Sequence, residues 1–150
     1  MTDRHRPEEG SSANWEDVLP HGRECRFIDE IVERSESGIS CRIRCRSNDP
    51  DCGVDIPAAI GIEYLAQASA LLCADPAAGS PPVQGGVVAS LRSFHCNRAT
   101  LALGTPFIAR AEVFSRGSDM SLLDCSLLDE QSGEVLMHGR LSIAFGKVQT

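Results

Sequence analysis

Glu63 and Gln67 interrupt an otherwise apolar stretch that runs from residue 55 to residue 75, DIPAAIGIEYLAQASALLCAD. They stand four residues apart, so on a helix they share one face and can hydrogen-bond to each other. An ionised carboxylate in apolar surroundings is costly unless it is paired, and no Lys or Arg occurs between Ser47 and Leu91. Glu63 therefore either reaches solvent at one helix end or faces a cavity, where it could act as a general acid or base or orient a water molecule.

The cysteines offer a second set of reactive side chains. The chain has 7 Cys, an odd number, and no C-x-x-C pair of the zinc-ribbon or redox kind. We interpret them as small buried hydrophobic residues kept reduced. Cys41 and Cys45 share one strand face with Ile43, which indicates a core stripe. A nucleophile built from Cys96 or Cys125 and a histidine has no supporting context, and we expect no metal and no cofactor.

The elements that must position these residues follow from the pattern of hydrophobic residues. Alternation predicts a hairpin of strands at about 25–34 and 38–47. The apolar stretch predicts one long helix that begins near Pro57 and ends near Asp75, buried on more than one side. Four further strands are predicted from strand-like runs separated by turn residues, at 83–99, 105–116, 120–130 and 134–147.

These elements predict an α+β fold in which one long central helix is wrapped by an antiparallel sheet of five to seven strands. The length of 150 residues suits a single domain, which we place at 14–150. Residues 1–13 are polar and predict a disordered tail. An open sheet of this kind leaves an edge strand, and pairing across a two-fold dimer is the simplest way to satisfy it.

Charge and composition exclude several classes of protein. A net charge of -7 and a pI of about 5.0 argue against nucleic-acid binding. The N-terminal residues contain no apolar run of the kind a secretory signal needs, and polar residues interrupt the 55–75 stretch, so we expect a cytoplasmic protein without a membrane segment. Arg42, Arg44 and Arg46 form an outward basic row, which is either a solvated strand face or a surface that steers an acidic partner.

Three segments together resemble one family: LPHGRECRFIDEIVE at 19–33, IPAAIGIEYLAQASALL at 56–72, and the strand region at 90–114. They are similar to the hot-dog-fold 3-hydroxyacyl-acyl-carrier-protein dehydratases, above all to the dehydratase-like proteins of aryl polyene gene clusters. The resemblance covers about residues 17–146. It implies a hot-dog fold, a role in fatty acid or polyene biosynthesis on thioesters of acyl carrier protein, and a homodimer or a heterodimer with another hot-dog protein.

The resemblance also implies roles for individual residues. In the family an acid of the central helix works with a histidine from the preceding loop, and a backbone N–H near the helix start holds the thioester carbonyl. Glu63 matches the acid, Gln67 matches the family's glutamine, and Ala58 stands where the family usually has the glycine that offers this N–H. Gly85 and Gly86 enter a strand that lines the family's acyl tunnel, so they make room for substrate or mark an ordinary bulge.

The loop before the helix departs from the family pattern. It reads NDPDCGVDIP over 48–57 and contains no histidine. His21 is then the candidate replacement base, the alternative being a capping or packing histidine, whereas His95 and His138 are interpreted as sheet residues. Three functions stay open: a dehydratase in which Glu63 protonates the leaving hydroxyl, a thioesterase in which it activates water, and a non-catalytic subunit that binds acyl carrier protein or completes a dimer with an active dehydratase.

Overall fold

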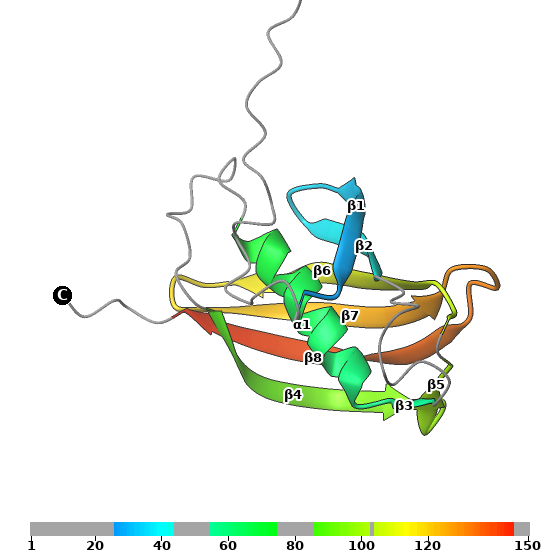
Figure 1. The fold of residues 1–150 in the computed structure, drawn as a ribbon. Helices are drawn as coiled ribbons and strands as arrows, with labels where there is room; N and C mark the ends of the chain where they lie inside the picture. Colours follow the sequence, from blue (N-terminus) through cyan, green and yellow to red (C-terminus); the bar gives the residue numbers. More distant parts are fainter. Residues whose placement is uncertain (1–25, 44–54, 75–85, 103, 146–150) are drawn as a thin grey trace, which may run out of the picture.

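The computed structural model describes residues 26–43, 55–74, 86–102 and 104–145. One helix, α1 (Ile60–Cys73), lies across one face of a 6-stranded antiparallel sheet with the strand order β1-β2-β6-β7-β8-β4 (Figure 1). The strands of this sheet are β1 (Ile28–Arg34), β2 (Gly38–Ile43), β4 (Gly86–Cys96), β6 (Phe107–Arg116), β7 (Met120–Asp129) and β8 (Val135–Phe145). Two short strands, β3 (Ile56–Pro57) and β5 (Thr100–Leu101), form a separate antiparallel pair.

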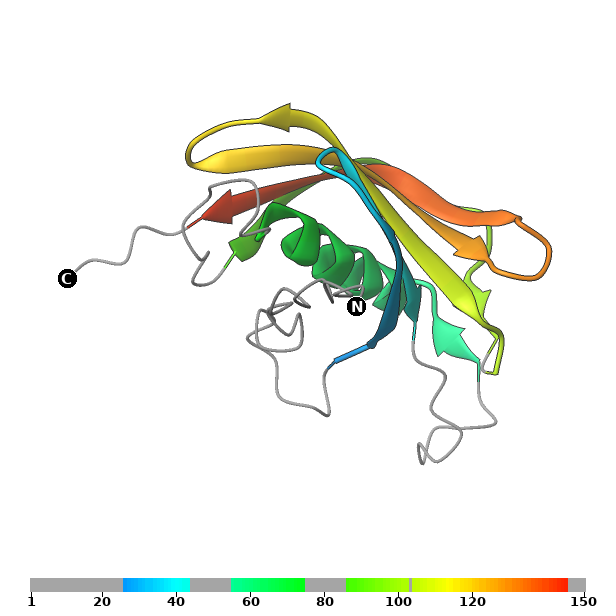
Figure 2. The same ribbon diagram turned by 90° about the horizontal axis from the view of Figure 1, so that it is seen from above.

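The sheet curves around α1, which lies in its concave face (Figure 2). The helix buries Leu65, Leu71 and Leu72 to 1% exposure or less against an inner sheet face that includes Leu123 and Leu141, both 0% exposed. Burial of each such side chain is worth about 1.5–3 kcal/mol. The predicted architecture of one central helix wrapped by five to seven strands is confirmed, as are the hairpin and the four later strands.

The helix begins at Ile60, not near Pro57 as the sequence pattern predicts. Pro57 instead belongs to β3, where it lies opposite Thr100. The pairing continues one residue further, because the Ala58 N–H donates to the Ala99 carbonyl at 2.9 Å. Strands of two residues are too short to show an alternating pattern, so β3 and β5 escaped prediction.

One helix does not cover the whole inner face of the sheet. Strand β4 lies at the edge, and on it Val88 and Leu91 are 37% and 45% exposed. Their cross-strand partners on β8, Ile143 and Leu141, are buried at 2% and 0%. The apolar surface of the core therefore continues onto β4, beyond the reach of α1.

The described cysteines are free thiols. Cys41, Cys73 and Cys125 are buried and Cys96 is exposed, so the prediction of small buried hydrophobic residues is confirmed for the first three. Burial raises the pKa of Cys41 to about 12 and that of Cys125 to about 11. Both side chains are therefore neutral thiols at neutral pH and poor nucleophiles.

Within the described ranges, no helix is long and apolar enough to span a membrane. The same residues contain no group of three or more His, Cys, Asp or Glu side chains arranged to hold a metal ion.

Alkylation should distinguish these thiols. At neutral pH we expect a reagent such as iodoacetamide to modify Cys96 in the folded protein and to spare Cys41 and Cys125, as read by peptide mass spectrometry. Equal labelling of all three thiols would contradict this assignment.

The same two buried thiols predict how stability depends on pH. The folded-state pKa values of Cys41 and Cys125 lie above the ordinary 9.0, so the unfolded chain loses these protons first. The free energy of unfolding should therefore be retained below pH 9.0 and fall as the pH rises through the range up to about 12.

Gly139 of β8 provides a test of packing between β8 and the edge strand. A Cβ at this position would lie 2.4 Å from Cδ2 of Phe94 on β4. We expect Gly139→Ala to destabilise the fold by about 1–3 kcal/mol in urea denaturation, because the ring must move. Gly38→Ala is the matched control, since its Cβ would meet no atom closer than 3.5 Å. Similar losses for both variants would contradict the close contact.

Candidate active site

Glu63 and Gln67 lie on one face of α1 and are hydrogen-bonded, as their spacing predicts. Nε2 of Gln67 donates to Oε1 of Glu63 at 3.1 Å, and Oε1 of Gln67 accepts the backbone N–H of Phe27 at 2.9 Å. Gln67 is only 1% exposed, whereas Glu63 is half-buried. The amide thus uses both of its ends to connect the chain ahead of β1 with the carboxylate. Glu63 is held in place and does not simply point into solvent.

Aromatic packing holds the chain at Phe27. The Phe27 ring meets the ring of Tyr64, on α1, edge-on with a centroid separation of 5.1 Å and an interplanar angle of 61°. Tyr64 is buried and follows Glu63 directly. The segment that enters β1 is therefore tied to the same turn of the helix that carries the acid.

His21 and Gly85 lie outside the described residues. His21 precedes Phe27 by six residues, a length that reaches about 20 Å when fully extended. Because Phe27 is tied to Gln67, this reach is sufficient for a histidine at position 21 to meet Glu63. Their pairing stays a prediction.

The backbone donors at the start of α1 are arranged differently from the expectation for Ala58. The Ala58 N–H is already used by the Ala99 carbonyl. No side chain caps the helix at Ala59, and the N–H groups of Ala59 and Ile60 find no acceptor among the described residues. Unpaired N–H groups at the positive end of a helix suit an electron-rich oxygen. Within the described part of the chain, Ala59 and Ile60 are thus open to an electron-rich oxygen, whereas the Ala58 N–H would have to exchange its partner.

Gly86 opens strand β4 opposite Phe145, and the register stays regular through Val87 and Val88. The irregularities of this strand come later, between Val88 and Ser90 and between Arg92 and His95. Of the two interpretations of Gly86, the bulge finds no support in this register. A role in making room for substrate remains a prediction.

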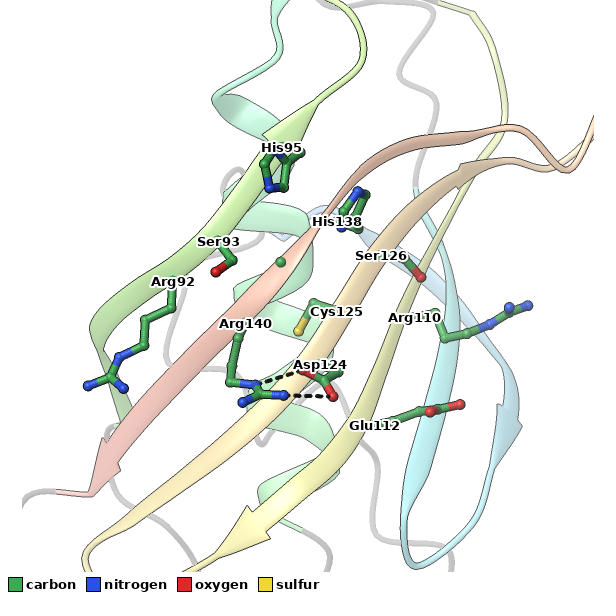
Figure 3. Close-up of a pocket in the computed structure, with 11 residues that line it drawn as sticks. Arg92, Ser93, His95, Arg110, Glu112, Asp124, Cys125, Ser126, His138 and Arg140 are labelled. Atoms are coloured by element: carbon green, nitrogen blue, oxygen red, sulfur yellow. Dashed lines mark hydrogen bonds and ion pairs between the residues drawn. The ribbon is translucent and has the colours of Figure 1, made fainter.

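The described histidines lie on the other face of the sheet. His95 of β4 and His138 of β8 are cross-strand partners whose ring centroids are 5.2 Å apart. They border a polar hollow of about 610 Å³ that Arg92, Arg110 and Arg140 also line, on the sheet face turned away from α1 (Figure 3). These histidines therefore cannot serve as the base that works together with Glu63 of the same chain. Their interpretation as sheet residues is confirmed.

The basic row predicted on the second strand is not a row of free cations. The Arg42 guanidinium is ion-paired with Glu30 and with Glu130, the latter at 2.6 Å. The hydrogen bond to Glu130 raises the pKa of Arg42, and the same contact lowers the pKa of Glu130. Arg44 and Arg46 lie outside the described residues. For Arg42 these ion pairs favour the solvated strand face over the steering surface, because two acids, from β1 and from the β7–β8 turn, neutralise its charge.

Solved structures with a similar architecture define the fold class. The dehydratase heterocomplex ApeI:P from Xenorhabdus doucetiae contains a chain with a TM-score of 0.77 at 15% identity, covering 89% of this chain and 91% of that one. Thioesterase superfamily member 2 of zebrafish gives a TM-score of 0.66 at 13% identity, with coverage of 88% and 93%. A thioesterase from Haemophilus influenzae gives 0.60 at 13% identity, with coverage of 81% and 80%. The chain has the hot-dog fold.

The family follows from the sequence match. The model of the ApeP-like family, described as ApeP dehydratase, matches residues 13–148, and the chain belongs to this family. A comparison with curated proteins finds no match.

The link between Phe27 and Gln67 is the feature of this site that sequence reasoning missed. The two residues are 40 positions apart, and neither their types nor their local patterns indicate the contact. We expect Gln67→Leu to destabilise the protein by about 1–3 kcal/mol, because the half-buried Phe27 N–H loses its acceptor. Urea denaturation measures this loss. The exposed Gln131→Leu is the control, and equal effects of the two substitutions would contradict the bridging role.

Proposed function

We propose that this chain takes part in the dehydration of 3-hydroxyacyl thioesters carried by acyl carrier protein, in cytoplasmic fatty acid or polyene biosynthesis, with Glu63 as the acid. The observation that carries the proposal is the carboxylate held on the central helix by the buried Gln67 amide. A general acid must be aimed at the oxygen it protonates, and a hydrogen bond from an anchored amide aims Glu63. Membership of the ApeP-like dehydratase family supports the same assignment.

The proposed reaction is an elimination of water. A base removes the proton from the carbon next to the thioester carbonyl, the bond between the β-carbon and its hydroxyl breaks, and Glu63 supplies the proton with which that hydroxyl leaves as water. The Ala59 and Ile60 N–H groups stabilise the negative charge that develops on the carbonyl oxygen. His21 is the proposed base, and Gly85 and Gly86 are proposed to leave room for the acyl chain.

Thioester hydrolysis is the second candidate. The loop at 48–57 contains no histidine, and proteins with a similar fold include thioesterases. In this reaction Glu63 removes a proton from water, which attacks the carbonyl, and the thiol leaves. A third role, as a subunit that binds carrier protein without catalysis, uses the same surface and no proton transfer at all.

We further propose that β4 pairs with a second hot-dog chain. The strand is 11 residues long, lies at the sheet edge and leaves Val88 and Leu91 uncovered. A long edge with an apolar inner face is a template for strand addition. The similar dehydratase structure is a heterocomplex, which supports a different chain as the partner; a second copy of this chain is the alternative.

Catalysis is tested with Glu63→Gln, which keeps the Gln67 contact possible but removes the proton. We expect conversion of 3-hydroxyacyl carrier protein to the alkene, followed by mass spectrometry, to fall by about 10²–10⁴-fold. Saturated and 3-hydroxyacyl thioesters of carrier protein and of coenzyme A are assayed in parallel for free thiol. Thiol release that depends on Glu63 would show that the protein is a thioesterase and not a dehydratase. Activity that is unchanged in Glu63→Gln would rule out Glu63 as the catalytic residue of either reaction.

Edge pairing is tested with Leu91→Asp. A carboxylate at this position would be buried in the pairing surface, so we expect the variant to sediment as a monomer where the wild-type chain, alone or with its partner, sediments as a pair. Val32→Asp is the matched control, since Val32 is 49% exposed on β1, the opposite edge strand. Loss of pairing in the control, or its retention in Leu91→Asp, would contradict the use of β4.

A further inference from the structure

The outer face of the edge strand β4 carries an arginine, Arg92, and a histidine, His95, and no acid. Arg92 lies opposite Arg140 of β8, and His95 lies opposite His138. The strand reads GVVASLRSFHC and contains neither Asp nor Glu. Basic side chains thus lie along the edge strand of the described sheet, in a protein whose net charge is -7.

Asp124, an acid that lines the same hollow, is already paired with Arg140. Asp124 of β7 accepts hydrogen bonds from Nε and Nη2 of Arg140 at 2.8 Å and 3.4 Å, and the Arg140 guanidinium also lies 3.5 Å from the centroid of the Phe114 ring. Among the described residues, no carboxylate forms an ion pair with Arg92. Within the described part of the chain, no acid compensates the charge of Arg92 beside the edge.

An irregularity in β4 places Arg92 and His95 on the same face. In a regular strand, residues three apart point to opposite faces. Here the register shifts between Arg92 and His95, and Ser93 adopts a φ of 52°. Phe94 packs against the core, whereas Arg92 and His95 lie on the outer face of the sheet, as Figure 3 shows. The bulge thus concentrates basic groups on one side of the pairing edge.

A second copy of this chain would bring like charges together. Full-length antiparallel pairing of Gly86–Cys96 with itself centres on Leu91, so the two Arg92 side chains become diagonal neighbours on the outer face. Diagonal neighbours lie about 7–8 Å apart, within reach of long side chains, and like charges across strands destabilise the pairing. The apolar contact on the inner face favours pairing, whereas the outer face opposes pairing with an identical strand.

We propose that β4 selects its partner by charge: it pairs with a hot-dog chain whose edge strand carries carboxylates on its outer face, in preference to a second copy of itself. This inference rests on the edge pairing proposed above and adds the chemistry of the partner. Carboxylates from the partner strand meet Arg92 and His95 across the edge. The polar hollow behind them, with Ser93 at its border, leaves space for these side chains.

The test uses a charge-reversed copy of the chain as the partner. Isotope-labelled Arg92→Glu/His95→Glu protein is mixed with unlabelled wild type, and native mass spectrometry counts the mixed and self-paired dimers. We expect the ratio of mixed to self-paired dimers to exceed the statistical value by about threefold or more, because each favourable cross-strand pair replaces a repulsive one. In 1 M salt, where screening acts within about 3 Å, the excess should disappear.

Arg110→Glu is the matched control, because Arg110 lines the same hollow from β6, away from the edge; it should mix statistically with wild type. Circular dichroism verifies folding, and the single variant Arg92→Glu replaces the double one if that fails to fold. Statistical mixing of the charge-reversed chain overturns charge selection alone. Absence of every paired species overturns both charge selection and the proposed edge pairing. The proposed catalysis by Glu63 does not depend on either result.

Discussion

The structure depends on one constraint: a single helix must cover the inner face of a six-stranded sheet. Helix α1 meets this demand with side chains that are apolar around most of its circumference, and Leu65, Leu71 and Leu72 are almost completely buried. Its reach nevertheless ends before the edge strand β4. The core of the described chain is therefore closed on the side of β1 and β2 and open on the side of β4, where Leu91 is exposed.

The same constraint explains how an acid is maintained on a buried helix. A polar group removed from water must recover its hydrogen bonds. Gln67 is only 1% exposed and recovers its hydrogen bonds inside the protein: its amide N–H donates to Glu63, and its amide oxygen accepts the backbone N–H of Phe27. The result is a carboxylate positioned at the border of the apolar interior. Fold stability and the proposed catalysis thus share one side chain.

The two faces of the sheet carry different kinds of residues. The inner face holds α1, Glu63 and the helix-start N–H groups, whereas the outer face carries the charged residues around His95 and His138. Strand β4 belongs to both faces, with apolar residues inside and Arg92 outside. A chain that pairs with β4 as proposed would meet apolar side chains on the inner face and Arg92 on the outer face.

The sequence by itself determined the hairpin, the buried helix and the pairing of Glu63 with Gln67, because these follow from periodicities and spacings within one element. The same periodicities predicted a sheet wrapped around one helix, and the resemblance of three segments to a known family identified this arrangement as the hot-dog fold. Tertiary structure alone decided that Phe27 binds Gln67, that the Ala58 N–H is occupied, and that Arg42 is neutralised by Glu130. Each of these contacts joins residues distant along the chain, and local patterns carry no information about which distant groups meet when strands and helix pack together.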